Sequence, residues 1–241
     1  MDLRNDLIGL GILLAYFLLF AGSTSLISYL ARGFFKEGAR KAYHVGFSLS
    51  IFILLYAFST WYTAVLAMGV ILLVAFIVVA IAEKRRVMRS ISINRRLSRF
   101  EVLYQIGYVF ITFSLLLFIF WGLMGPDFRY IAALGVAAWG LGDASAALIG
   151  KKFGGRHFPR LWFNPPKSWE GFLGMTAASG LGIFFVLLLF SPLPLIYVFL
   201  FSLLLGSAAA FIEAISRKGT DTLTVPLAVS ALAAPILFFF S

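Results

Sequence analysis

Eight long apolar segments, separated by charged or turn-forming residues, most strongly limit what this chain can fold into. An α-helix needs roughly 20 apolar residues to cross the hydrocarbon core of a bilayer, and each segment approaches that length. The segments are continuously apolar and do not alternate in polarity, so they predict helices and not the strands of a membrane barrel. They occupy residues 7–31, 42–58, 61–82, 102–124, 128–150, 169–190, 194–213 and 222–240.

The composition excludes a water-soluble domain. Hydrophobic residues make up 61% of the 241 residues and only 12% are charged, whereas a soluble domain is about half apolar and about a quarter charged. The chain has no cysteine, which excludes disulfides, thiol catalysis and cysteine-ligated metal sites. We therefore expect an all-α fold with a single domain over residues 1–241, a polytopic membrane helical bundle of about eight transmembrane helices.

The positions of the basic residues orient this bundle. Of the 20 lysines and arginines, 18 fall in four connecting segments that an eight-helix count places on one side of the membrane. Only Arg4 and Arg129 fall on the other side. The positive-inside rule makes the basic side cytoplasmic, so both termini are expected to be extracytoplasmic. The four segments are residues 32–41, 83–101, 151–168 and 214–221.

The net charge of +10 also bears on partners. In a membrane protein such an excess is typical of topology determinants and of contacts with anionic lipids, and we expect no nucleic-acid partner. The longest basic loop, 83–101, is either an amphipathic segment on the lipid headgroups or a solvated topology loop. We place the protein in a prokaryotic cell membrane, with its functional face toward the cytoplasm. Nothing in the sequence supports an oligomer.

Asp143 is the most unusual residue within the apolar segments. It lies eight residues before Lys151, about 12 Å along a helix, and a carboxylate at such a depth normally marks a function or a partner. It is either an acid paired with a lysine of a neighbouring helix or a metal ligand or proton acceptor in a polar pocket. A stripe of small residues around it would let another helix pack closely. The stripe consists of Ala138, Gly142, Ala146 and Gly150.

Two basic stretches follow Asp143. Lys151 and Lys152 belong to a glycine-rich run that either neutralises phosphates or only fixes the topology. Before segment 169–190, Asn164 or Ser168 can cap the next helix, with Lys167 beside its positive end and Glu170 in its first turn. This helix start is either an anion site or a purely structural cap.

Further polar residues stand at the same ends of three other segments. Glu213 closes segment 194–213, and Asp221 with Thr224 opens the next one, where Asp221 is either functional or a plain N-cap. Arg40, Lys41 and His44 open segment 42–58, and His44 is either a packed ring or a direct participant.

The shared location of these groups predicts a function. Carboxylates, lysines and helix N-termini are the groups that hold a divalent cation and a polyphosphate. Their convergence at the cytoplasmic ends of different helices indicates a membrane-embedded phosphoryl or nucleotidyl transferase. Such an enzyme would take a group from a cytosolic nucleotide to a lipid acceptor.

Four ordered blocks between residues 40 and 226 resemble the diacylglycerol/polyprenol kinase family. This family comprises phytol and farnesol kinases, dolichol kinase and the fungal CTP-dependent diacylglycerol kinase, and its nucleotide region is similar to CDP-diacylglycerol synthases. The chain departs from the family at Ala144, where many members have glycine, and at Thr222, where asparagine is usual. The blocks are Arg40-Lys41-x-x-His44, Gly142-Asp143 followed by Gly150-Lys151-Lys152-Phe153-Gly154, Asn164-x-x-Lys167-Ser168-x-Glu170-Gly171, and Glu213 with Asp221-x-Leu223-Thr224-Val225-Pro226.

The resemblance implies a kinase that moves the terminal phosphate of CTP onto a membrane lipid alcohol with Mg²⁺. The acceptor would be a polyprenol or dolichol, a phytol-type prenol or diacylglycerol. The implied catalytic residues are Asp143, Lys167 and Asp221, the metal ligands Asp143, Glu213 and Asp221, the phosphate-binding residues Arg40, Lys41, Lys151, Lys152, Lys167, Ser168 and Thr224, and the accessory residues His44, Asn164 and Glu170.

Two alternatives remain at this point. A cytidylyltransferase that forms a CDP-lipid would use the same nucleotide site. An ion-coupled transporter would use Asp143 as its coupling site, although transporters usually show paired halves with interrupted helices, and no repeat is evident here.

Overall fold

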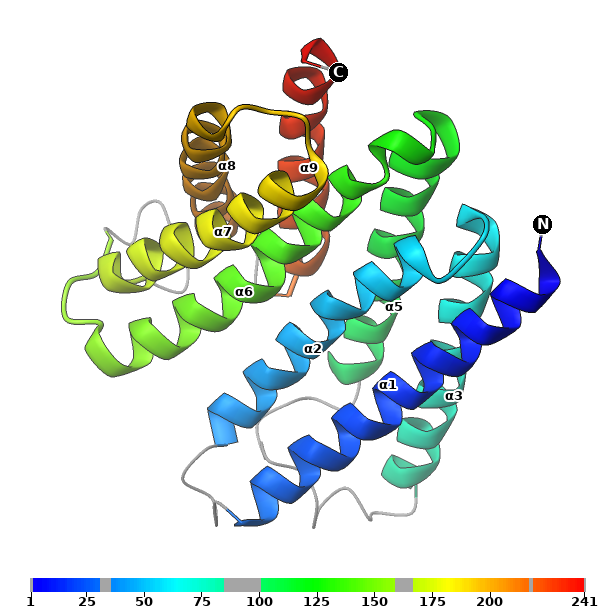
Figure 1. Ribbon diagram of the computed structural model, residues 1–241. Helices are drawn as coiled ribbons and strands as arrows, with labels where there is room; N and C mark the ends of the chain where they lie inside the picture. Colours follow the sequence, from blue (N-terminus) through cyan, green and yellow to red (C-terminus); the bar gives the residue numbers. More distant parts are fainter. Residues whose placement is uncertain (1, 31–35, 85–100, 159–166, 217–218, 241) are drawn as a thin grey trace.

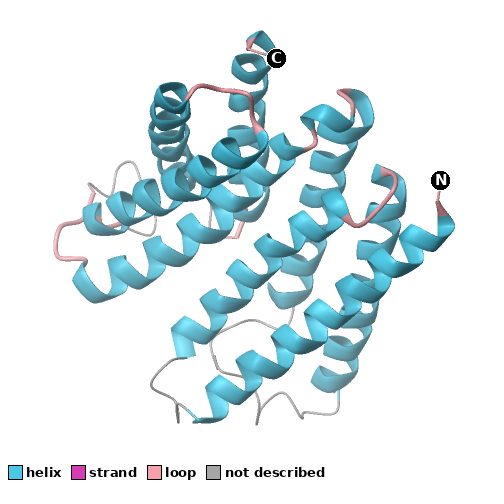
Figure 2. Ribbon diagram, in the orientation of Figure 1, coloured by secondary structure: helices cyan, strands magenta, loops and turns pink. Residues whose placement is uncertain are grey.

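The computed structural model describes residues 2–30, 36–84, 101–158, 167–216 and 219–240, and this part of the chain is all-helical (Figures 1 and 2). A π-helical turn, Phe118–Leu123, continues α5, and a short 3-10 turn, Pro126–Phe128, precedes α6. The long helices are α1 (Leu3–Leu30), α2 (Lys36–Tyr56), α3 (Trp61–Lys84), α5 (Glu101–Leu117), α6 (Tyr130–Phe153), α7 (Trp169–Phe190), α8 (Leu195–Ile215) and α9 (Asp221–Phe239).

These helices confirm the helical bundle predicted from the apolar segments. Seven of the eight long helices are by length and composition apolar enough to cross a membrane. The exception is α2, whose apolar part, His44–Tyr56, is shorter because its first turns carry charged residues. One of these, Lys41, is only 4% exposed, so its charged side chain is covered by protein rather than by lipid.

The helix α6 is the centre of the bundle. Its span is 72% buried, whereas no other candidate span exceeds 39%. It packs against α7, α2 and α9, and α7 in turn packs against α8. The outer helices instead expose large apolar side chains such as Leu18, Leu66 and Leu203. This distribution is typical of a helix bundle whose outer surface meets lipid.

Small residues of α6 allow its neighbours to approach closely. A Cβ atom at Gly142 would meet the Ser179 hydroxyl of α7, and one at Gly135 would meet the main-chain carbonyl of Pro226 in α9. The Ser179 hydroxyl donates a hydrogen bond of 2.7 Å to the carbonyl of Ala138. The predicted stripe of small residues therefore faces α7, as close helix packing requires.

Both chain ends lie on the same side of the bundle, away from the C-terminal end of α6 (Figure 1). At the chain-end side, the guanidinium of Arg129 lies 4.3 Å from the ring centre of Tyr56 and 5.6 Å from that of Trp121. Which side of the membrane the termini face stays a prediction, and most of the basic loop 83–101 lies outside the described residues.

Candidate functional site

A cavity of about 270 Å³ lies where α6, α7 and α8 meet, at the end of the bundle away from the chain termini. It contains five residues that were predicted from the sequence to be functional. Its lining consists of Asp143, Ala146, Ala147, Gly150, Lys151, His157, Lys167, Ser168, Gly171, Phe172, Glu213 and Ala214.

Asp143 is paired with a lysine of a neighbouring helix, as one of its two interpretations predicted, while its role as a metal ligand or proton acceptor stays a prediction. It lines the cavity, yet it is only 8% exposed and its carboxylate is paired with α2. The Lys41 Nζ atom donates a hydrogen bond of 2.5 Å to Asp143 Oδ2, and His44 Nδ1 lies 3.3 Å from the same oxygen. A buried carboxylate needs such partners, because an unpaired charge inside a protein is strongly unfavourable.

A second ion pair joins Lys167, which lies before α7, to Glu213 of α8, and both residues line the cavity. The Lys167 ammonium donates a hydrogen bond to Glu213 Oε1, and its Nζ atom also lies 3.5 Å from the main-chain carbonyl of Glu213. Lys167 immediately precedes α7 and Glu213 belongs to the last turns of α8. The pair therefore places one cation and one carboxylate at the same cavity wall.

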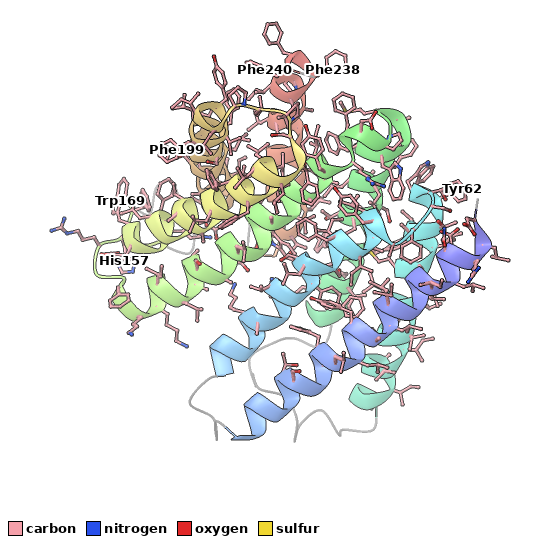
Figure 3. The ribbon with its side chains drawn as sticks, viewed as in Figure 1. Tyr62, His157, Trp169, Phe199, Phe238 and Phe240 are labelled. Carbon is pink, nitrogen blue, oxygen red and sulfur yellow. The ribbon has the colours of Figure 1, made fainter. Side chains whose placement is uncertain are left out.

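The segment after α6 is held against the start of α7. Ser168 caps α7, since its hydroxyl accepts a 3.1 Å hydrogen bond from the amide of Gly171. The amide of Phe158 donates to the carbonyl of Lys167 at 2.9 Å, and the amide of Trp169 donates to that of Arg156 at 2.9 Å. Figure 3 shows His157 and Trp169 together at this end of the helix pair.

Glu170 also belongs to this arrangement. Its Oε1 atom accepts hydrogen bonds of 3.3 Å from the amides of Gly155 and Arg156. It thereby holds the glycine-rich segment in place beside the cavity and does not line the cavity itself. Its accessory role in the reaction stays a prediction.

Asp221 is the first residue of α9 and is not its N-cap, which corrects one of the two interpretations. The N-cap position belongs to Thr220, without a side-chain cap hydrogen bond. Asp221 is close enough to Asp143, Glu213 and Lys41 to interact with their charges. The nearby hydroxyl of Thr224 lies 2.7 Å from that of Ser216 and donates to the carbonyl of Thr220 at 3.1 Å, so it connects α9 to the end of α8.

The remaining predicted residues lie away from the cavity or cannot be placed. Lys152 is exposed and its Nζ atom lies 5.1 Å from the ring centre of Phe153. Arg40 belongs to α2, but its side chain lies outside the described residues, as does all of Asn164. Their phosphate-binding and accessory roles stay predictions.

The carboxylates do not form a ready-made metal cage. Among the described residues, no group of three or more histidine, aspartate or glutamate side chains comes together closely enough to hold a metal ion. Mg²⁺ is, however, commonly held by one or two protein carboxylates plus phosphate oxygens. Asp143 and Glu213, which line one cavity with Lys151 and Lys167, fit that kind of site.

Among the lining residues that were not predicted from the sequence to be functional, His157 and Phe172 have the largest side chains. His157 directly follows the glycine-rich basic run, and this position was the available sequence signal that it lies at the site. Phe172 lies four residues after Ser168, so both side chains fall on one face of the α7 start. The ring of Phe172 also contacts Phe158 and Trp169, with ring centres 5.7 Å and 6.2 Å away.

Comparison with known proteins gives one informative similarity. No family model matches the chain. No solved structure matches it. A phytol kinase of Synechocystis sp. (strain ATCC 27184 / PCC 6803 / Kazusa) is 35% identical over 105 residues, which cover 42% of this chain and 42% of that relative. The chain is thus distantly similar to a phytol kinase, over less than half the length of either protein.

Proposed function

We propose that this protein is a membrane kinase that transfers a phosphoryl group from a nucleotide to the hydroxyl of a membrane lipid alcohol. The observation that carries the proposal is the single cavity into which Asp143, Lys151, Lys167 and Glu213 converge. Further support comes from the partial similarity to a phytol kinase. The substrates are a cytosolic nucleotide, for which we propose CTP, and a polyprenol, a phytol-type prenol or diacylglycerol.

The cations of the cavity suit a polyphosphate. Lys151 at the end of α6 and Lys167 at the start of α7 lie on the same cavity, and the positive end of the α7 dipole adds to their field. Transfer requires that the phosphates be held in line with the acceptor and that their charge be offset. In this proposal both lysines hold phosphates, with Arg40 and Lys152 as outer cations.

Asp143 is the acidic group best placed to serve the acceptor. In this proposal its carboxylate orients the lipid hydroxyl and accepts its proton as the oxygen attacks the terminal phosphorus. A new bond then forms between the lipid oxygen and the terminal phosphorus, while the bond from that phosphorus to the leaving nucleoside diphosphate breaks. Lys41 and His44 of α2 hold this carboxylate in position through its Oδ2 atom.

The same carboxylates suit a Mg²⁺ ion that arrives with the nucleotide. One or two of these carboxylates, from Glu213 and Asp143 in the cavity and Asp221 at the neighbouring helix start, would hold it together with phosphate oxygens. When bound, the ion would offset the negative charge of the phosphates. We place the cavity on the cytoplasmic side of a prokaryotic plasma membrane, with anionic lipids around the basic loops.

The direct test uses the purified protein in lipid nanodiscs. It is incubated with each nucleoside triphosphate, Mg²⁺ and a panel of phytol, farnesol, a polyprenol and diacylglycerol. The expected products are a nucleoside diphosphate and a lipid phosphate, absent with Asp143→Asn. Pyrophosphate with a CDP-lipid, formed when phosphatidic acid is supplied, would identify a cytidylyltransferase instead. Solute uptake into sealed vesicles without nucleotide turnover would identify a transporter.

A further inference from the structure

We propose that Thr112 of α5 is a positioning residue for Asp221, because its hydroxyl holds the first turn of α9 through the main-chain carbonyl of Thr222. The inference rests on the proposed function, in which Asp221 belongs to the reaction site. It assigns a role to a residue of α5, a helix that contributes nothing to the lining of the cavity.

The argument begins with Pro226, which lies inside α9. In a regular helix the amide of residue 226 would donate a hydrogen bond to the carbonyl of Thr222. Proline has no amide hydrogen, so that carbonyl loses its helical donor. Inside a membrane bundle no bulk water can replace the donor, and a side chain of a neighbouring helix is the usual substitute.

Thr112 supplies such a side chain. Its Oγ1 atom lies 3.1 Å from the carbonyl oxygen of Thr222 and 2.7 Å from that of Tyr108 in its own helix. Thr112 is 2% exposed and Thr222 is 4% exposed, so the contact is sealed from solvent and lipid. The Tyr108 carbonyl also accepts a hydrogen bond from an amide of its own helix, whereas the Thr222 carbonyl has lost its helical donor. When the Thr112 hydroxyl hydrogen is shared between the two carbonyls, it therefore stabilises α9 more than α5.

This contact acts on the residue next to Asp221. Asp221 begins α9, directly after Thr220 and a Gly219 with φ of +88°, so no preceding helical turn braces it. On the α8 side, the first turn is held by the 2.7 Å contact between the hydroxyls of Ser216 and Thr224. On the α5 side, it is held by Thr112. Without the second contact, the first turn of α9 is free to shift, and Asp221 shifts with it.

The test compares Thr112→Val, which removes the hydroxyl at nearly constant volume, with Thr112→Ser, which keeps the hydroxyl. Thr176→Val is the matched control, because Thr176 is half-buried and its hydroxyl donates within α7, to Phe172 at 3.1 Å. We expect kcat to fall about tenfold to a hundredfold in Thr112→Val, as for a displaced reaction group. Thr112→Ser and Thr176→Val should remain within about threefold of wild type.

Pro226→Ala sharpens the test, because it restores the amide donor to Thr222. In this background Thr112→Val should change kcat by less than about threefold, since the hydroxyl is then dispensable. Hydrogen exchange of the Leu223 and Thr224 amides gives a second readout that needs no turnover. Exchange should accelerate in Thr112→Val and return to the Pro226→Ala value in the double variant.

The outcomes separate this inference from the proposed function. If the wild type phosphorylates no lipid alcohol, the proposed function is wrong, and the exchange data alone decide whether Thr112 holds α9. If the wild type is active but Thr112→Val matches it in kcat, the positioning role is refuted, whatever happens to the melting temperature. If Thr112→Val does not fold, the decision falls to the double variant Thr112→Val/Pro226→Ala. This variant must fold and match Pro226→Ala in kcat and amide exchange, and if it does not, the inference is refuted.

Discussion

At the scale of single residues, the buried pair of Lys41 and Asp143 connects stability with chemistry. Neither residue is more than 8% exposed, and their atoms are joined by a 2.5 Å hydrogen bond. Removing one partner of a buried pair leaves an uncompensated charge, which typically costs about 3–5 kcal/mol of stability. A loss of activity after substitution of Asp143 therefore needs a companion variant that separates the two effects.

We predict that Asp143→Asn lowers kcat at least about a hundredfold, equivalent to about 2.7 kcal/mol, because the amide cannot accept the hydroxyl proton. It should also lower the melting temperature, since Lys41 loses its partner. The double variant Asp143→Asn/Lys41→Met should regain thermal stability and stay inactive. Specific activity and melting temperature measured on the same sample check this, and an active double variant would reduce Asp143 to a structural residue.

Lys167 offers a second prediction at this scale. Lys167→Ala should lower kcat/KM for the nucleotide about tenfold to a hundredfold, because a charge-assisted hydrogen bond to a phosphate contributes about 1.5–3 kcal/mol. Arg4→Ala is the matched control, since Arg4 is exposed at the start of α1 and lies outside the cavity lining. Steady-state kinetics with varied nucleotide distinguish the two. Equal losses in both variants would mean that the cavity does not bind the phosphates.

The sequence could predict that Asp143 needs a partner but not which residue supplies it. A lysine from another helix was one of two interpretations, yet Lys41 is 102 positions away and is one of 20 basic residues. Choosing it requires the packing of α2 on α6, which no local pattern encodes. The same holds for Lys167 and Glu213, which are 46 positions apart.

At the scale of the helices, prediction from the sequence succeeded where the length of an apolar run alone determines the structure. Long apolar runs have few alternatives in a bilayer, so the eight segments and the eight long helices correspond closely. It was less successful for the start of α2, because Lys41, which a hydropathy argument assigns to water, is buried in an ion pair with Asp143. The stripe on α6 was recognised because close helix packing needs small residues at a fixed spacing.

A prediction at the same scale concerns Gly142. A methyl group there would meet the Ser179 hydroxyl and Met175 of α7, so Gly142→Ala should force α6 and α7 apart and cost about 1–3 kcal/mol of stability. Gly11→Ala is the matched control, because a Cβ at Gly11 has open space around it. Thermal or denaturant unfolding in detergent measures the difference. Equal stability of the two variants would contradict the close packing of α6 on α7.

At the scale of the whole molecule, α6 explains why the site lies at one end of the bundle. Helices α2, α7 and α9 all pack on α6, and the polar ends of α2, α6, α7, α8 and α9 meet around Asp143 and Glu213. Elsewhere, the described helices expose many large apolar side chains. In the proposed function, the lipid hydroxyl enters from the bilayer while its apolar tail stays among the helices, and the nucleotide arrives from the aqueous side.

The topology depends on whether α2 crosses the membrane. Seven helices meet the length and hydropathy criteria, and seven crossings would place the termini on opposite sides. The structure favours a crossing by α2 as well. Asp6, near the start of α1, accepts hydrogen bonds from the amide of Ser59 at 2.7 Å and from its hydroxyl at 2.9 Å. Ser59 follows the end of α2, so α2 returns to the level at which α1 begins.

We therefore predict that the N-terminus and Asp127 lie outside the cell and Lys152 inside it. Among the described residues, four long helices lie between the N-terminus and Asp127, and α6 then leads from Asp127 to Lys152. The absence of cysteine makes single-cysteine labelling clean. In intact cells, a membrane-impermeant maleimide should label Asp127→Cys, and an antibody should reach an N-terminal tag. Lys152→Cys should be labelled only after permeabilisation, since the excess of basic residues keeps its side cytoplasmic. If Lys152→Cys and the tag are instead reached from the same side of the membrane, α2 does not cross it, and the predicted topology is wrong.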